Sequence, residues 1–96
     1  MSYSIIIPSF NSSNHITSKI TKLINLLNKI SIKYEIIIVD DCSTDNSPTK
    51  IIKLISSIKK TRIKMIKNTT NTGKSFSIRK AIIRSNYEKI ILIDSD

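Results

Sequence analysis

The fold of this chain can be predicted from one stretch, Tyr34-Glu35-Ile36-Ile37-Ile38-Val39-Asp40-Asp41-Cys42-Ser43-Thr44-Asp45-Asn46-Ser47. Its apolar run, 36–39, is entirely β-branched and shows no polar alternation, which is typical of a strand buried on both faces. Two carboxylates, Asp40 and Asp41, follow at the carboxyl end of that strand, where ligands bind in open parallel α/β sheets. Adjacent carboxylates repel each other and make poor core residues, so this pair indicates a site.

Apolar runs on both sides of that stretch predict three more strands. These runs lie at 3–7, 62–66 and 89–93, and the first strand should finish near Pro8, because proline cannot donate to a strand ladder. A helix is predicted between the first two strands, where apolar residues recur at helical spacing: Ile16, Ile20, Leu23, Ile24 and Leu27.

Two further helices complete the predicted order. Ser47 can cap one of them with Pro48 in its first turn, and residues 74–85 form the other. The order βαβαβαβ requires crossover connections, so we expect one α/β domain over 1–96, with a mainly parallel sheet and helices on both faces. The residues expected to face the core are Ile51, Ile52, Ile55 and Ile58 in the second helix, and Ile78, Ala81 and Ile82 in the third.

Polar segments follow all four predicted strands. They lie at 9–11, 40–45, 68–73 and 94–96. Because the carboxyl ends of parallel strands meet at one edge of a sheet, we expect these segments to lie together and to form the functional site.

The last of these segments, Asp94-Ser95-Asp96, carries two carboxylates at alternate positions. Oxygen ligands of this kind suit Mg²⁺ or Mn²⁺, which proteins often share with the phosphates of a substrate. An Asp-x-Asp triplet is a weak signal by itself, and the alternative is a turn whose carboxylates are merely solvated. Its position after a strand favours a metal site.

A second motif, Thr72-Gly73-Lys74-Ser75, resembles the end of a phosphate-binding P-loop. Asn68 stands where that loop needs its first glycine, and the segment follows the third strand of the domain rather than the first. The alternative is that Gly73 supplies a backbone position that other residues rarely adopt, while Lys74 supplies a nearby positive charge.

Composition restricts the class of protein. No apolar run approaches the roughly 20 residues of a membrane span, and the amino-terminal residues lack the pattern of a signal peptide. The single cysteine, Cys42, excludes an internal disulfide and fits a reducing compartment. We therefore expect a cytoplasmic protein, or one at the cytoplasmic face of a membrane.

The chain carries 16 basic and 7 acidic residues, a formal net charge of +9. This charge fits nucleic acid, an anionic membrane surface or a phosphorylated small molecule, and equally a solvated basic face. The lysines are spread over several segments without interleaved aromatic residues, so nucleic acid is the least supported of these partners.

Taken together, the motifs resemble those of the family 2 glycosyltransferases, which have the Rossmann-like GT-A fold. Segment 4–11 is similar to that family's opening strand and its Pro-Ser-Phe-Asn-type loop, and 37–45 is similar to its Val-Asp-Asp-Gly-Ser-x-Asp signature. Segment 71–74 with the following Arg79 resembles its Asn-x-Gly segment and helix, and 94–96 its Asp-x-Asp metal motif. The resemblance implies that 1–96 is the amino-terminal, nucleotide-sugar-binding half of such an enzyme.

The same resemblance implies roles for individual residues. Pro8 and Phe10 would line the nucleobase pocket of the nucleotide-sugar site. Asp41 would accept a hydrogen bond from the base, and Asp40 would support that turn. Lys74 would lie close to the base or the diphosphate, and Asp94 would bind the ribose or the metal's water shell. Asp96 would ligate the metal, Mg²⁺ or Mn²⁺, together with Asp94.

The activity implied is inverting transfer from a UDP- or GDP-sugar to an acceptor hydroxyl or a polyprenyl phosphate. The resemblance implies that the segment binding the acceptor, which is a glycan, lipid or protein, would lie beyond Asp96. The catalytic base would lie there too, so no catalytic residue is identified within 1–96. Peripheral membrane association and a homo-oligomer are compatible with this assignment. The alternatives are a non-catalytic nucleotide-binding module, a P-loop-like or phosphatase-like phosphate-handling enzyme, and a basic nucleic-acid-binding domain.

Overall fold

Strands and helices alternate along the chain in the predicted order. The structure, a computed structural model, describes residues 1–58 and 62–95. Within them the elements are β1 (Ser2–Ser9), α1 (Ile16–Lys29), β2 (Lys33–Asp40), α2 (Ser47–Ser57), β3 (Arg62–Lys67), α3 (Lys74–Ile83) and β4 (Lys89–Leu92).

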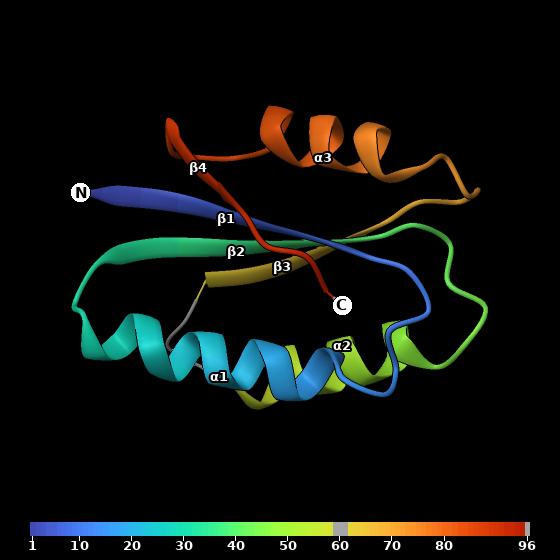
Figure 1. Cartoon of the computed structure of the whole chain (residues 1–96), viewed down its shortest axis with the longest axis horizontal. Coiled ribbons are helices and arrows are strands. Elements are labelled where there is room, and N and C mark those ends of the chain that lie inside the picture. The colour runs from blue at the N-terminus through green and yellow to red at the C-terminus, as the bar shows by residue number, and fades with distance from the viewer. Residues whose placement is uncertain (59–61, 96) are drawn as a thin grey trace.

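The sheet has the strand order β3-β2-β1-β4, and every neighbouring pair is parallel. Figure 1 shows α1 and α2 on one face of the sheet and α3 on the other. This arrangement confirms the predicted α/β fold with helices on both faces, and places β1 and β2 at the centre of the sheet.

The central strands supply the core on both faces, as the unbroken apolar run predicted. Ile36 and Ile38 face α1 and α2, whereas Ile37 and Val39 face α3, and all four are fully buried. Successive side chains of a strand point to opposite faces, so only a central strand needs apolar residues at every position.

Three details of the prediction were wrong. Ile52 is 55% exposed and Ile82 is 44% exposed, although both were expected in the core. Each follows a buried residue, Ile51 or Ala81, and one step along a helix rotates a side chain by about 100° away from the face of its neighbour. Ser47 is the first residue of α2 rather than its cap.

The parallel arrangement brings the carboxyl ends of the strands to one edge. Ser9 at the end of β1 lies opposite Asp40 at the end of β2, and Asp40 lies opposite Lys67 at the end of β3. The ladder continues into the loops, where Asp41 N donates to Ser9 O at 2.9 Å and Asn68 N donates to Asp40 O at 2.8 Å. The polar segments after the strands therefore start from fixed positions.

Candidate functional site

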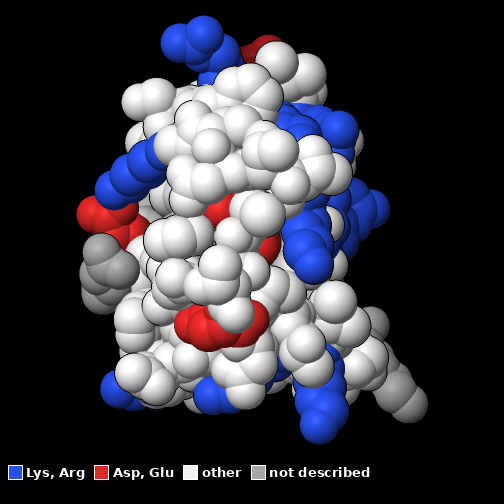
Figure 2. Space-filling model, turned by 90° about the vertical axis from the view of Figure 1, so that its right-hand side faces the viewer, with Lys and Arg blue, Asp and Glu red and all other residues white. Residues whose placement is uncertain are grey.

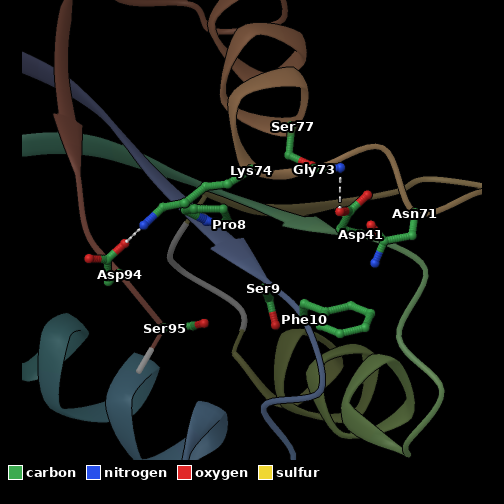
Figure 3. A pocket seen from close by; sticks show the side chains of 10 residues that line it. All are labelled: Pro8, Ser9, Phe10, Asp41, Asn71, Gly73, Lys74, Ser77, Asp94 and Ser95. Carbon is green, nitrogen blue, oxygen red and sulfur yellow. Dashed lines mark hydrogen bonds and ion pairs between the residues drawn. The ribbon is translucent and has the colours of Figure 1, made fainter.

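A cavity of about 340 Å³ opens at this edge of the sheet, within the size range of small-molecule sites. Figure 2 faces this edge and shows acidic atoms near its centre and basic side chains gathered along one side. The lining residues come from the end of β1, the segments that follow β2, β3 and β4, and the start of α3: Pro8, Ser9, Phe10, Asp41, Asn71, Gly73, Lys74, Ser77, Asp94 and Ser95 (Figure 3).

Asp41 organises the loop between β3 and α3. Its Oδ1 accepts hydrogen bonds from Thr72 N at 2.8 Å, Thr72 Oγ1 at 3.0 Å and Asn68 Nδ2 at 3.0 Å, and its Oδ2 accepts from Gly73 N at 2.8 Å. Burial raises the pKa of Asp41, but the bonds from Thr72, Asn68 and Gly73 together lower it below the usual value. Asp41 is therefore ionised at neutral pH and acts as an acceptor only.

These bonds also bear on the P-loop alternative. A P-loop cradles phosphate with the backbone N–H groups of its loop. Here the N–H groups of Thr72 and Gly73 are donated to the Asp41 carboxylate. Gly73 has φ +92° and an added Cβ would meet nothing within 4 Å, so its backbone angle, rather than crowding, explains the glycine.

Asp40 holds the turn that follows β2. It is fully buried, and its carboxylate accepts hydrogen bonds from Ser43 Oγ at 2.5 Å and from Ser43 N at 3.1 Å. Cys42 has φ +60° within this turn. Asp40 is the one proposed nucleotide-binding residue that does not line the cavity, and its bonds fit the supporting role expected for it.

A clamp between the first two loops was missed in the sequence. Asn11, with φ +49°, accepts hydrogen bonds at Oδ1 from Thr44 N at 2.8 Å and from Asp45 N at 3.3 Å, while Asp45 Oδ2 accepts from Ser13 N at 3.1 Å. Asp45 Oδ1 accepts from Ser47 N at the start of α2, at 2.9 Å. The signal was present, because Asn tolerates positive φ and Asp often binds the start of a helix.

The same contacts change the ionisation of Asp45. The Ser47 hydroxyl is the largest cause, and with the backbone N–H groups of Ser47 and Ser13 it outweighs burial and lowers the pKa of Asp45 to about 2. The clamp is therefore charged under all but strongly acidic conditions.

Lys74 and Asp94 form an ion pair across the cavity. Lys74 is the first residue of α3, Asp94 follows β4, and the Lys74 ammonium donates a hydrogen bond to Asp94 Oδ1. Figure 3 shows the Lys74 side chain extended past Pro8 to reach Asp94. The hydrogen bond and the charge of Lys74 lower the pKa of Asp94. Both residues were predicted at the site, but their pairing was not.

The predicted metal ligands are only partly within the described chain. Asp96 lies outside the described residues, and within 1–58 and 62–95 there is no group of three or more His, Cys, Asp or Glu side chains that could hold a metal. Asp94 presents an exposed carboxylate to the cavity. Mg²⁺ is commonly held by one or two carboxylates together with substrate phosphates and water, so Asp94 fits as one ligand of such a set.

Pro8 and Phe10 reach the cavity from the end of β1. Pro8 is buried, whereas Phe10 is 46% exposed. Figure 3 shows Phe10 next to Ser9 in the cavity lining. A half-exposed aromatic ring beside a carboxylate can stack on a flat heterocycle while the carboxylate accepts a hydrogen bond from its edge. The structure thus brings Phe10 and Asp41 into one cavity, as the sequence predicted.

Comparisons with solved structures gave several matches to glycosyltransferases. The mannosyltransferase PcManGT from Pyrobaculum calidifontis, in complex with GDP-Man and Mn²⁺, has a TM-score of 0.86 at 21% identity, covering 98% of this chain and 27% of its own. S. aureus TarS 1-349 in complex with UDP-GlcNAc has a TM-score of 0.78 at 31% identity, covering 100% and 27%. The glucosyl-3-phosphoglycerate synthase from Mycobacterium tuberculosis, in complex with Mn²⁺, UDP and glucosyl-3-phosphoglycerate, has a TM-score of 0.76 at 20% identity, covering 99% and 33%.

The two structures at 20% and 21% identity show the fold alone, and this chain spans about a third or less of each of the three. A comparison with curated proteins found no match. No helix in the described part of the chain is long and apolar enough to cross a membrane. The model of the family described as glycosyl transferase family 2 matches residues 4–96. With nearly the whole length matched and the motifs placed at one edge of the sheet, the chain belongs to glycosyl transferase family 2.

Proposed function

We propose that this chain binds a nucleotide-diphosphate sugar, with uracil or guanine as the base, together with Mg²⁺ or Mn²⁺. One observation carries the proposal: a single cavity is lined by Asp41, Lys74 and Asp94, which come from the loop after β2, the start of α3 and the segment after β4. An acceptor for a base, a cation for phosphate and a carboxylate for a metal are the three groups that such a ligand requires.

The hydrogen bonds of Asp41 support the choice of base. Among the described residues Oδ1 receives three donors, whereas Oδ2 receives one, from Gly73. A carboxylate oxygen can accept more than one hydrogen bond, and Oδ2 is the less occupied of the two. Oδ2 therefore has room for one more donor. Uracil and guanine carry a ring N–H that can fill this position, whereas cytosine and adenine present an acceptor nitrogen there.

The charges at the other end of the cavity support binding of the diphosphate. Lys74 supplies a positive charge at the start of α3, and Asp94 supplies a carboxylate oxygen for the cation, with Asp96 as the predicted second ligand. A divalent cation bound there would neutralise negative charge as the diphosphate departs.

The proposed reaction is inverting transfer of the sugar to an acceptor hydroxyl or a polyprenyl phosphate. Figure 2 shows basic side chains gathered along one side of this edge of the molecule, and their charge suits an anionic acceptor, including one presented at the cytoplasmic face of a membrane. We assign no catalytic base within residues 1–96.

Thermal denaturation tests the binding step. UDP- and GDP-sugars with Mn²⁺ should raise the melting temperature, because a ligand that binds only the folded state stabilises it, whereas CDP- and ADP-sugars should raise it far less. Equal shifts with all four bases would contradict the role of Asp41. Binding without sugar transfer by the full-length gene product would favour the non-catalytic alternative.

A further inference from the structure

The Lys74 ammonium occupies Oδ1, one of the two carboxylate oxygens that Asp94 could offer to a metal. It donates to Asp94 Oδ1 from the opposite side of the cavity (Figure 3). An ammonium and a divalent cation repel each other and compete for the same oxygen lone pairs. Metal binding at Asp94 Oδ1 therefore requires Lys74 to leave.

The main chain of Lys74 is fixed, so only its side chain can leave. The preceding residue, Gly73, donates its N–H to Asp41 Oδ2 at 2.8 Å, and Lys74 begins α3. A lysine side chain has four rotatable carbon segments that can redirect its ammonium while the backbone stays in place. Because Lys74 lines the cavity, its flexible side chain can direct the released ammonium to another part of that cavity.

The ion pair is also weak enough to exchange. The side chains of Lys74 and Asp94 are 59% and 64% exposed, and solvent-exposed pairs of this kind contribute little to stability. Such a pair can neutralise the two side chains while the site is empty, and it can still break easily when a ligand binds.

We propose that Lys74 is a placeholder for the metal: it neutralises Asp94 in the empty site and moves to the diphosphate when the metal and nucleotide bind. The proposal rests on the proposed function, because the diphosphate is the second partner of Lys74. It makes Lys74 a positioning residue with opposite effects on two ligands, hindering binding of the metal alone and assisting binding of the nucleotide.

Binding of Mn²⁺ alone, followed by calorimetry, tests the first effect. Lys74→Met should bind Mn²⁺ about two- to fivefold more tightly than the unmodified protein, the factor that corresponds to loss of an exposed ion pair. Lys22→Met removes the same charge from the exposed face of α1 and should leave the Mn²⁺ affinity unchanged. The gain should disappear in Lys74→Met combined with Asp94→Asn, which removes the oxygen for which the two cations compete.

Binding of UDP without metal tests the second effect. Lys74→Met should bind UDP more weakly than the unmodified protein, whereas Lys22→Met should not. Unchanged or weaker Mn²⁺ binding by Lys74→Met would overturn the proposed replacement of Lys74 by the metal. If nucleotides still bind in that case, the proposed function stands. Tighter Mn²⁺ binding with no binding of any nucleotide would support the competition at Asp94, but overturn the transfer to diphosphate together with the proposed function.

Discussion

Asp41 Oδ2 accepts a hydrogen bond from Gly73 N at 2.8 Å, although 32 positions separate the two residues. This contact ties the end of the central strand β2 to the residue that precedes α3. The position of Lys74 therefore depends on a carboxylate in the stretch that determines the fold.

Asp41→Asn should both loosen this loop and weaken nucleotide binding. In this variant an amide NH₂ group would replace one carboxylate oxygen and would face the N–H group of Thr72 or Gly73. Each hydrogen bond to a charged group that is lost costs about 1.5–3 kcal/mol. We expect the free energy of unfolding in urea to fall by about 2 kcal/mol or more. Thr72→Val is the matched control, because it removes the Oγ1 donor at 3.0 Å and retains the backbone bond. Equal losses for the two variants would show that the Asp41 charge does not organise the loop.

Gly73→Ala should destabilise the protein although there is space for the methyl group. At φ +92° an L-residue is strained, at a cost of about 1–3 kcal/mol, while nothing lies within 4 Å of the added Cβ. Urea denaturation should show this loss, and Ser75→Ala, on the exposed face of α3, should show almost none. An unchanged midpoint in Gly73→Ala would mean that the loop relaxes to a different backbone angle.

The clamp at Asp45 should make stability depend on pH in a narrow acidic range. The pKa of Asp45 is about 2 in the folded protein and 3.8 in the reference state, so its contribution is complete above pH 3.8 and is lost as the pH falls towards 2. We expect the difference in unfolding free energy between the unmodified protein and Asp45→Asn to be constant from pH 5 to 7 and to shrink below pH 4. A difference that does not change with pH would contradict the charged clamp.

Much of the fold follows from sequence because its determinants are local. The run 36–39 has no polar face, which only a strand buried on both sides explains, and the strand ends then gather the polar segments at one edge. The errors have equally local causes: Ile52 and Ile82 each adjoin a buried residue, so an apolar pair does not reveal which member faces the core.

The contacts of the site were less predictable. Asp41 could be assigned to the cavity from its place after β2, but its bonds to Thr72 and Gly73 join segments about 30 residues apart. The pairing of Lys74 with Asp94 depends likewise on the direction of a long side chain across the cavity. Periodicity places residues on elements, whereas such pairings depend on the assembled sheet.

Glu35, at the opposite end of β2, offers a test that separates the fold from the site. It is buried, and it accepts hydrogen bonds from Ser4 Oγ at 2.6 Å, Asn86 N at 2.6 Å and Asn86 Nδ2 at 3.0 Å. Burial raises the pKa of Glu35, but these bonds and the nearby Lys64 charge together lower it below its usual value.

Glu35→Ala should lower the free energy of unfolding by about 1–3 kcal/mol, since it removes the acceptor of the buried Ser4 hydroxyl and of two hydrogen bonds from Asn86. The affinity for nucleotide should not change in the folded protein, because Glu35 lies at the edge opposite the cavity. Glu88→Ala, at an exposed position, is the control and should change neither quantity. A loss of nucleotide affinity in Glu35→Ala at a temperature where the protein is folded would show coupling between the two edges.

The central claim is that one site at the carboxyl edge binds nucleotide diphosphate and metal together. The most direct measurement is calorimetric titration of UDP and of GDP into the protein with and without Mn²⁺, repeated with Asp96→Ala. The account predicts that Mn²⁺ strengthens binding of at least one of the two nucleotides and that Asp96→Ala abolishes this gain while the metal-independent part remains. If Mn²⁺ changes neither affinity, or if the gain persists in Asp96→Ala, the account is contradicted.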